Sequence, residues 1–109
     1  MITVKKCATH YVEIYMSGPI DVIYQTCRSV CTKEGLCVTV TPTRYIYTGG
    51  EEEGVIIGLL NYPRFPCTQA ELYDKGVALA HLLLDESHQH SVLLKTALET
   101  TWISRREHK

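Results

Sequence analysis

Residues 45–62 read YIYTGGEEEGVIIGLLNY, and this stretch decides the fold. The Gly-Gly corner with its three glutamates is typical of a hairpin turn, because glycine adopts the positive φ angles that tight turns need. The strand that enters the turn carries tyrosines and polar residues, whereas residues 54–60 of the returning strand carry no charge. A strand that is apolar on both faces is typical of the middle of a sheet. We therefore expect 54–60 to be a central strand.

The segments before the hairpin predict a strand, a helix and a second strand. Residues 11–17 alternate between apolar and polar side chains, as a strand does, and this strand begins either there or as early as Ile2. From residue 20 onward the apolar side chains recur at helical spacing, and Gly35 is an expected helix end. Residues 36–41 alternate again. Because Pro42 cannot donate to a ladder, that strand is bent, bulged or at an edge of the sheet.

The segments after the hairpin predict a second helix and further strands. Residues 68–71 read TQAE, a capping box that opens a helix ending near Ser87. Residues 90–96 form a strand, and residues 100–104, TTWIS, form a short extra strand near the C-terminus.

The order of these elements is strand, helix, strand, strand, helix, strand over a single domain, 1–109. This order predicts an α+β, ferredoxin-like split βαβ (βαββαβ) sandwich. Its four-stranded antiparallel sheet has two helices on one face, with the C-terminal strand as a possible addition. The first and third strands are central in this topology, and the second and fourth lie at the edges.

The sheet face away from the helices predicts self-association. In VIIGLLNY only one set of alternating side chains can meet the helices, and the tyrosines at 11, 15, 45 and 47 lie close to the other set. Large exposed apolar patches mark interfaces. We expect a dimer or trimer formed through sheet faces or edge strands. The alternative is that TTWISRR folds back and covers the patch within one chain.

Composition excludes several classes of function. The formal net charge of −1 gives no long-range attraction to nucleic acid or to an anionic membrane. The third strand also lacks the aromatic and basic residues with which sheets of this topology stack RNA bases. No apolar stretch approaches the length of a membrane span, and the N-terminus is not a signal peptide. We therefore expect a cytoplasmic protein with no nucleic-acid or membrane partner.

Cysteine and histidine spacings do not predict a metal or a cofactor. Five cysteines without a secretion signal are typical of reduced thiols, and Cys27 and Cys31 fall on the apolar stripe of the first helix. His88 and His90, with Glu86 or His81, are interpreted as exposed turn residues rather than ligands. The glutamates at 51, 52 and 53 are interpreted as a solvated turn rather than a cation site.

A polar and aromatic set is the candidate ligand site. Tyr45, Tyr47, Asn61 and Arg64 form a rim able to hold an anionic or ring-bearing ligand, such as a nucleotide, and we expect this rim in a cleft between subunits. Arg64 lies in a rigid loop, YPRFP, that presents one guanidinium group.

The same hairpin resembles the second-strand hairpin of the CutA family, small trimeric ferredoxin-like proteins akin to the PII signalling proteins. The resemblance covers about 25 residues and implies a trimer with clefts between subunits; it does not extend to copper binding. It rests on Cys37–Thr39, Pro42, Tyr45 with Tyr47, Gly49–Glu53 and Val55–Leu60.

These observations favour a homo-oligomer without catalytic activity that binds a small molecule or a protein as a regulator. The alternatives are a small enzyme that uses His10 or His88 and His90 as acid–base groups, and an accessory protein that binds and inhibits another protein.

Overall fold

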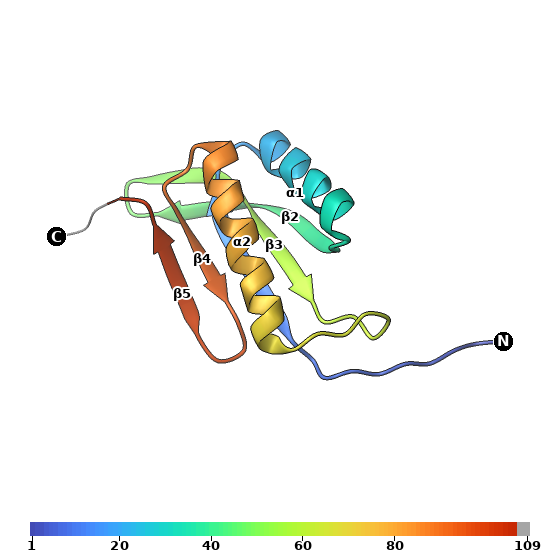
Figure 1. The fold of residues 1–109 in the computed structure, drawn as a ribbon. Helices are drawn as coiled ribbons and strands as arrows, with labels where there is room; N and C mark the ends of the chain where they lie inside the picture. Colours follow the sequence, from blue (N-terminus) through green and yellow to red (C-terminus); the bar gives the residue numbers. More distant parts are fainter. Residues whose placement is uncertain (107–109) are drawn as a thin grey trace.

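The computed structural model describes residues 1–106 and contains two helices and five strands. Figure 1 shows their arrangement along the chain. The elements are β1 (Tyr11–Ser17), α1 (Ile20–Glu34), β2 (Val38–Tyr47), β3 (Gly50–Leu60), α2 (Gln69–Ser87), β4 (Ser91–Lys95) and β5 (Thr100–Ser104).

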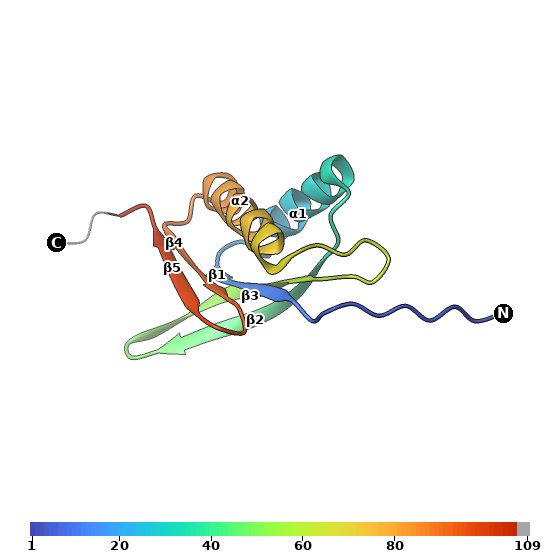
Figure 2. The ribbon, with the colours of Figure 1, turned by 60° about the horizontal axis from the view of Figure 1, so that its bottom comes forward.

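The five strands form one antiparallel sheet in the order β2-β3-β1-β4-β5. Both helices cover the same face, and the opposite face is open (Figure 2). The ferredoxin-like prediction is confirmed, with β3 and β1 in the middle and β2 at an edge. The prediction that β4 is the other edge is wrong, because β5 pairs with it along its whole length.

Alternation in the central strands divides their side chains between the two faces. Val12, Ile14 and Met16 of β1 and Val55, Ile57 and Leu59 of β3 are buried beneath the helices. They form one core with α1, α2 and β4, which contribute Ile23, Cys27, Leu72, Leu79, Ala80, Leu83, Leu84, Val92 and Leu94. Because every second residue of β3 enters this core, Gly54, Ile56, Gly58 and Leu60 are left on the open face.

The C-terminal strand is fastened to the helix layer. The Arg105 side chain donates through Nη1 to the Asp85 carboxylate (2.7 Å) and through Nη2 to the Leu84 carbonyl (2.9 Å) at the end of α2. A guanidinium at the last carbonyls of a helix also interacts favourably with the helix dipole. The alternative in which TTWISRR folds across the open face is therefore wrong, since β5 extends the sheet sideways.

The β2–β3 hairpin is longer than the sheet that supports it. The last pair between β1 and β3 is Ser17–Gly54, whereas β2 and β3 stay paired as far as Tyr47–Gly50. We call this projecting part, Arg44–Glu53, the arm; it extends beyond the sheet in Figure 2. A two-stranded ribbon with no third strand has little stability of its own.

The end of α1 and the start of α2 lie where the sequence predicts them. Gly35 has φ 65° and closes α1 with its N–H bonded to the Cys31 carbonyl. Thr68 and Glu71 form the predicted capping box at the start of α2, with the Thr68 N–H donating to Glu71 Oε1 (3.0 Å) and the Glu71 N–H donating to Thr68 Oγ1 (3.1 Å).

Within residues 1–106 there is no helix that combines the length and the apolar character needed to cross a membrane.

The capping box predicts a pH dependence of stability. The hydrogen bonds from the backbone and side chain of Thr68, together with the charge of Lys75, lower the pKa of Glu71. Glu71 therefore contributes stability above its unfolded pKa, and this contribution is lost as the pH falls through the lower folded value. We expect the difference in unfolding free energy between the wild type and Glu71→Ala to shrink from pH 7 to pH 3 in urea titrations. A difference of equal size at both pH values would contradict this account.

Candidate functional site

An apolar row crosses the open face of the sheet. The register places Ile56 of β3 beside Tyr15 of β1, Tyr15 beside Leu93 of β4, and Leu93 beside Trp102 of β5. Because paired residues of antiparallel strands point to the same face, these four side chains form a continuous stripe. Trp102 is 53% exposed. An aromatic stripe across an open sheet face is a surface on which a flat ligand or another protein can pack.

A charged row lies next to this stripe. Glu13 of β1 pairs with Lys95 of β4 in the register, and their side chains form an ion pair with 3.8 Å between Nζ and Oε1. The Tyr15 hydroxyl donates to the same Glu13 carboxylate atom at 3.4 Å. These contacts hold the Tyr15 ring over the open face.

The root of the arm adds a second aromatic wall. The Tyr45 hydroxyl donates to the Val55 carbonyl at 2.6 Å, so its ring lies across β3. This position requires Gly54: a Cβ there would lie 2.5 Å from Cε2 of the Tyr45 ring and 2.8 Å from the Ser17 Cα, and would collide with the Met16 carbonyl oxygen. Burial raises the pKa of Tyr45, and nearby Tyr15 raises it further. Tyr45 is therefore a neutral hydrogen-bond donor at neutral pH.

A hollow of about 260 Å³ lies between the arm and the apolar row. Each of the five strands contributes residues to its lining. The lining residues are Tyr15, Met16, Ser17, Tyr45, Tyr47, Glu52, Ser91, Val92, Leu93 and Trp102. The volume lies just below the range of about 300–1,000 Å³ that ligand pockets occupy. The hollow is small and open to solvent.

Glu52 is the one charged residue among the ten that line this hollow. It faces Tyr45 across the arm, and its carboxylate lies next to Tyr47. The pKa of Tyr47 is raised by local desolvation and by this carboxylate. A carboxylate among aromatic rings attracts cations, because both the charge and the ring faces are negative. The hollow therefore favours a ligand with a positive charge and a flat, apolar part.

The four residues predicted as a ligand rim do not meet within one chain. Tyr45 and Tyr47 line the hollow, whereas Asn61 and Arg64 lie beyond the opposite end of β3. Asn61 is nine positions along the chain from Glu52, which in an extended strand is about 30 Å. The Asn61 side chain is occupied by its own chain, since its Nδ2 donates to the Ala8 carbonyl and its Oδ1 accepts from the Cys67 N–H, both at 2.8 Å. A cleft between subunits that includes Arg64 stays a prediction.

Sequence reasoning does not place Glu52 and Trp102 at this hollow. The three glutamates, interpreted from the sequence as a solvated turn, are exposed but belong to β3, and strand alternation places Glu52 on the face of Tyr45 and Glu51 on the other face. The signal was present in the alternation of the arm. Trp102 required the pairing of TTWIS with β4, which no local pattern specifies.

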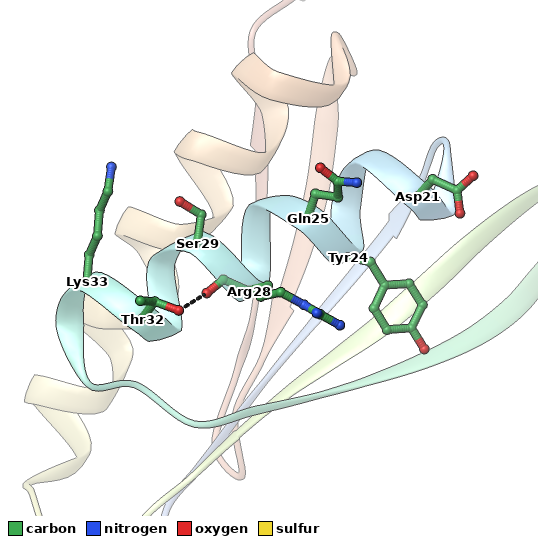
Figure 3. A pocket seen from close by; sticks show the side chains of 7 residues that line it. All are labelled: Asp21, Tyr24, Gln25, Arg28, Ser29, Thr32 and Lys33. Atoms are coloured by element: carbon green, nitrogen blue, oxygen red, sulfur yellow. Dashed lines mark hydrogen bonds between the residues drawn. The ribbon is translucent and has the colours of Figure 1, made fainter.

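A second hollow runs along the outside of α1 (Figure 3). All of its lining side chains project from this one helix: Asp21, Tyr24, Gln25, Arg28, Ser29, Thr32 and Lys33. A single helix supplies one wall and cannot enclose a ligand, so this surface is a solvated helix face.

The histidines and cysteines do not form a site in the part of the chain described. Among residues 1–106 there is no group of three histidine, cysteine or acidic side chains that could hold a metal. All five cysteines are free, and burial, with nearby Cys31 adding to it, raises the pKa of Cys27 to about 11. Cys27 is thus an unreactive core residue, as its helical spacing predicts. His88 is an exposed helix cap with φ 56°, and no histidine lines the hollow.

Comparison with known proteins finds the same fold in two solved structures. No protein-family model and no curated protein matches the chain. A phage SAM lyase in its apo state matches with a TM-score of 0.74 and 17% identity over 92% of both chains. A phage SAM lyase in complex with S-methyl-5'-thioadenosine matches with a TM-score of 0.77 and 14% identity over 100% of this chain and 99% of that chain.

At this level of identity the likeness shows a shared fold. The expectation of a non-catalytic regulator is nevertheless contradicted, because both of these proteins are lyases. They favour the alternative of a small enzyme, although the histidines that we expected to serve it do not line the hollow. Neither match is a CutA or PII protein, so that resemblance stays a prediction.

Proposed function

We propose that the protein is a lyase that cleaves S-adenosylmethionine at the hollow beneath the arm. The observation that carries the proposal is the pairing of one carboxylate, Glu52, with the rings of Tyr15, Tyr45, Tyr47 and Trp102. S-adenosylmethionine combines a sulfonium cation and an ammonium group with a flat adenine ring. The lyase structure that holds S-methyl-5'-thioadenosine, the thioether left when the bond from sulfur to the methionine γ-carbon breaks, supports this ligand class.

The reaction needs no water and no cofactor. In the simplest balanced path, an oxygen of the substrate's own carboxylate forms a bond to the γ-carbon. The bond from that carbon to sulfur breaks at the same time, and its electron pair stays on sulfur. The products are the neutral thioether and a five-membered lactone that keeps its ammonium charge, so atoms and charge balance.

The protein's part in this path is to fold the substrate and exclude water. The free substrate loses conformational entropy when its carboxylate reaches the γ-carbon. A protein that binds the substrate already folded lowers the barrier by this amount. Aromatic walls on both sides of the hollow restrict the adenosine part, and Glu52 attracts the ammonium group or the sulfonium. An apolar site also weakens the solvation of the carboxylate, which makes it a better nucleophile.

A second copy of the chain completes the pocket in this proposal. The hollow is open on one side, and its stripe of Ile56, Tyr15, Leu93 and Trp102 presents apolar surface there. Covering such a face removes water from both the stripe and the ligand. A cytoplasmic location fits this substrate and the free thiols.

Turnover in isotopically labelled water tests the reaction. We expect the purified protein to convert S-adenosylmethionine to S-methyl-5'-thioadenosine and the lactone. Mass spectrometry measures both products. In water enriched with ¹⁸O, the lactone formed first should carry no label, whereas a hydrolase would label the four-carbon product. The slow uncatalysed decay of the substrate is the baseline. A rate equal to that baseline would overturn the proposal.

A further inference from the structure

One edge of the sheet carries unpaired backbone groups. The Glu53 carbonyl accepts from the Gly18 N–H (3.1 Å) and the Asn61 N–H donates to the His10 carbonyl (3.0 Å), so odd-numbered residues at both ends of β3 face β1. Backbone groups of alternate residues point to opposite sides of a strand, so even-numbered residues of β3 face β2. We call residues 38–42 of β2 the open edge.

The register identifies which groups of the open edge are free. Val38, Val40 and Pro42 pair with odd-numbered residues of β3, and therefore turn their backbone groups away from it. Pro42 fits this arrangement, because its missing N–H falls on the outer side. The backbone of Val38 lies near the Cys31 sulfur at the end of α1 and lowers the pKa of that thiol. The N–H of Val40 and the carbonyls of all three residues remain available to an added strand.

An apolar groove of about 240 Å³ follows the open edge. It lies between α1 and β2, and its lining residues are Tyr24, Cys27, Arg28, Cys31, Val38 and Val40. Figure 3 shows Tyr24 reaching from α1 toward the strand below it. A strand added at the open edge would place every second side chain in this groove.

The N-terminal segment is an extended tail with apolar side chains in solvent. Ile2 is 90% exposed and Val4 is 76% exposed, and residues 1–6 make no hydrogen bond or ion pair within the described chain. The tail begins at a fixed base, where Asn61 binds the Ala8 and His10 carbonyls. From there it leads away from the sheet (Figures 1 and 2). In an extended chain, Ile2 and Val4 share one face.

We infer that residues 2–6 of one copy add a strand to the open edge of a second copy, with Ile2 and Val4 in the groove beside α1. The tail brings donors and acceptors to an edge that needs both, and two β-favouring apolar side chains to a groove that holds them. The open edge of the same chain is an unsuitable partner for the tail. Two strand spacings, about 10 Å, separate β1 from β2, and the tail points away from them.

Serine substitutions on the two faces of the tail test this contact. Ile2→Ser/Val4→Ser removes the apolar face in the full chain, and Thr3→Ser/Lys5→Ser changes the opposite face as a matched control. By sedimentation equilibrium, we expect the first variant to self-associate about tenfold or more weakly than the wild type, and the control to stay within about threefold. Equal self-association of the wild type and the first variant would overturn the inference.

A peptide measures the receiving edge directly. A labelled peptide of residues 1–7, with serine in place of Cys7, should bind saturably to the full-length Ile2→Ser/Val4→Ser chain. Val40→Pro removes the free N–H but no bond to β3, and should abolish this binding with the circular dichroism unchanged. If that variant does not fold, Tyr24→Ser tests the groove instead. Peptide binding to a chain whose wild type is a monomer would overturn the inference, because the tail would then occupy its own edge.

These experiments measure self-association and peptide binding, and neither depends on enzymatic turnover. A chain without lyase activity that still binds the peptide would refute the proposed reaction and retain the tail contact.

Discussion

Replacement of Glu52 by glutamine is expected to lower kcat/KM for S-adenosylmethionine about 30-fold. The carboxylate is the one charge among the residues that line the hollow, and it is opposite in sign to the substrate's two cationic groups. A hydrogen bond to a charged group is worth about 2 kcal/mol, which corresponds to this factor. This prediction takes the ammonium group as the partner of Glu52, and the charge of that group does not change during the reaction. The loss should therefore appear as a raised KM with kcat little altered.

Glu51 provides the matched control. It is the neighbouring residue of the same arm, but it pairs with Ile46 on the other face, and its carboxylate accepts from Arg44 Nε at 3.1 Å. Glu51→Gln removes the same charge and should leave steady-state kinetics within about twofold of the wild type, because a surface ion pair contributes little. An equal fall in kcat/KM in the two variants would mean that the arm attracts the substrate only through its total charge. Glu52 would then make no specific contact with the substrate.

Replacement of Gly54 by alanine is expected to lower the free energy of unfolding by about 3 kcal/mol. The added methyl group collides with the Met16 carbonyl, with the Ser17 Cα and with the Tyr45 ring, and two of these are backbone atoms that cannot rotate away. Overpacking of a well-filled site costs about 1–3 kcal/mol, and backbone collisions belong at the upper end. Urea unfolding followed by circular dichroism measures the change.

Gly58 is the control for this substitution. It lies on the same face of the same strand, but a Cβ there meets only the Thr39 side chain, with Oγ1 at 2.5 Å, and this hydroxyl can change rotamer. Gly58→Ala should therefore cost less than about 1 kcal/mol, since reduced freedom of the unfolded chain offsets part of the contact. A similar loss at both positions would show that strand glycine itself, and not the packing of Tyr45 on Gly54, sets the stability.

Much of the fold follows from local patterns in the sequence. The alternation of residues 11–17, the cap at Thr68 and the end of α1 at Gly35 each depend on neighbours within one turn or one strand, and each is where the sequence predicts it. β4 lies inside the sheet because β5 pairs with it, and Arg105 joins the end of β5 to Asp85 of α2, 20 residues earlier in the chain. No periodicity contains that contact.

The candidate site is harder to predict because it depends on strand register. Alternation divides the side chains of each strand between two faces, but Glu52, Trp102 and Tyr15 become neighbours only when four separate strands are aligned. Asn61 and Arg64 were grouped with the tyrosines because they are polar and close in sequence to the hairpin. Most of the extended strand β3 separates them from the tyrosines, so residues that are close in the sequence lie far apart in the fold.

The arm also gives the molecule an uneven stiffness. Tyr47 and Glu52 belong to a ribbon two strands wide that no other layer supports, whereas Tyr15 and Trp102 belong to the part of the sheet that the helices brace. Thermal bending of the ribbon therefore changes the width of the aromatic gap without disturbing the core. Entry and exit of a small molecule in this design would depend on the elasticity of one hairpin.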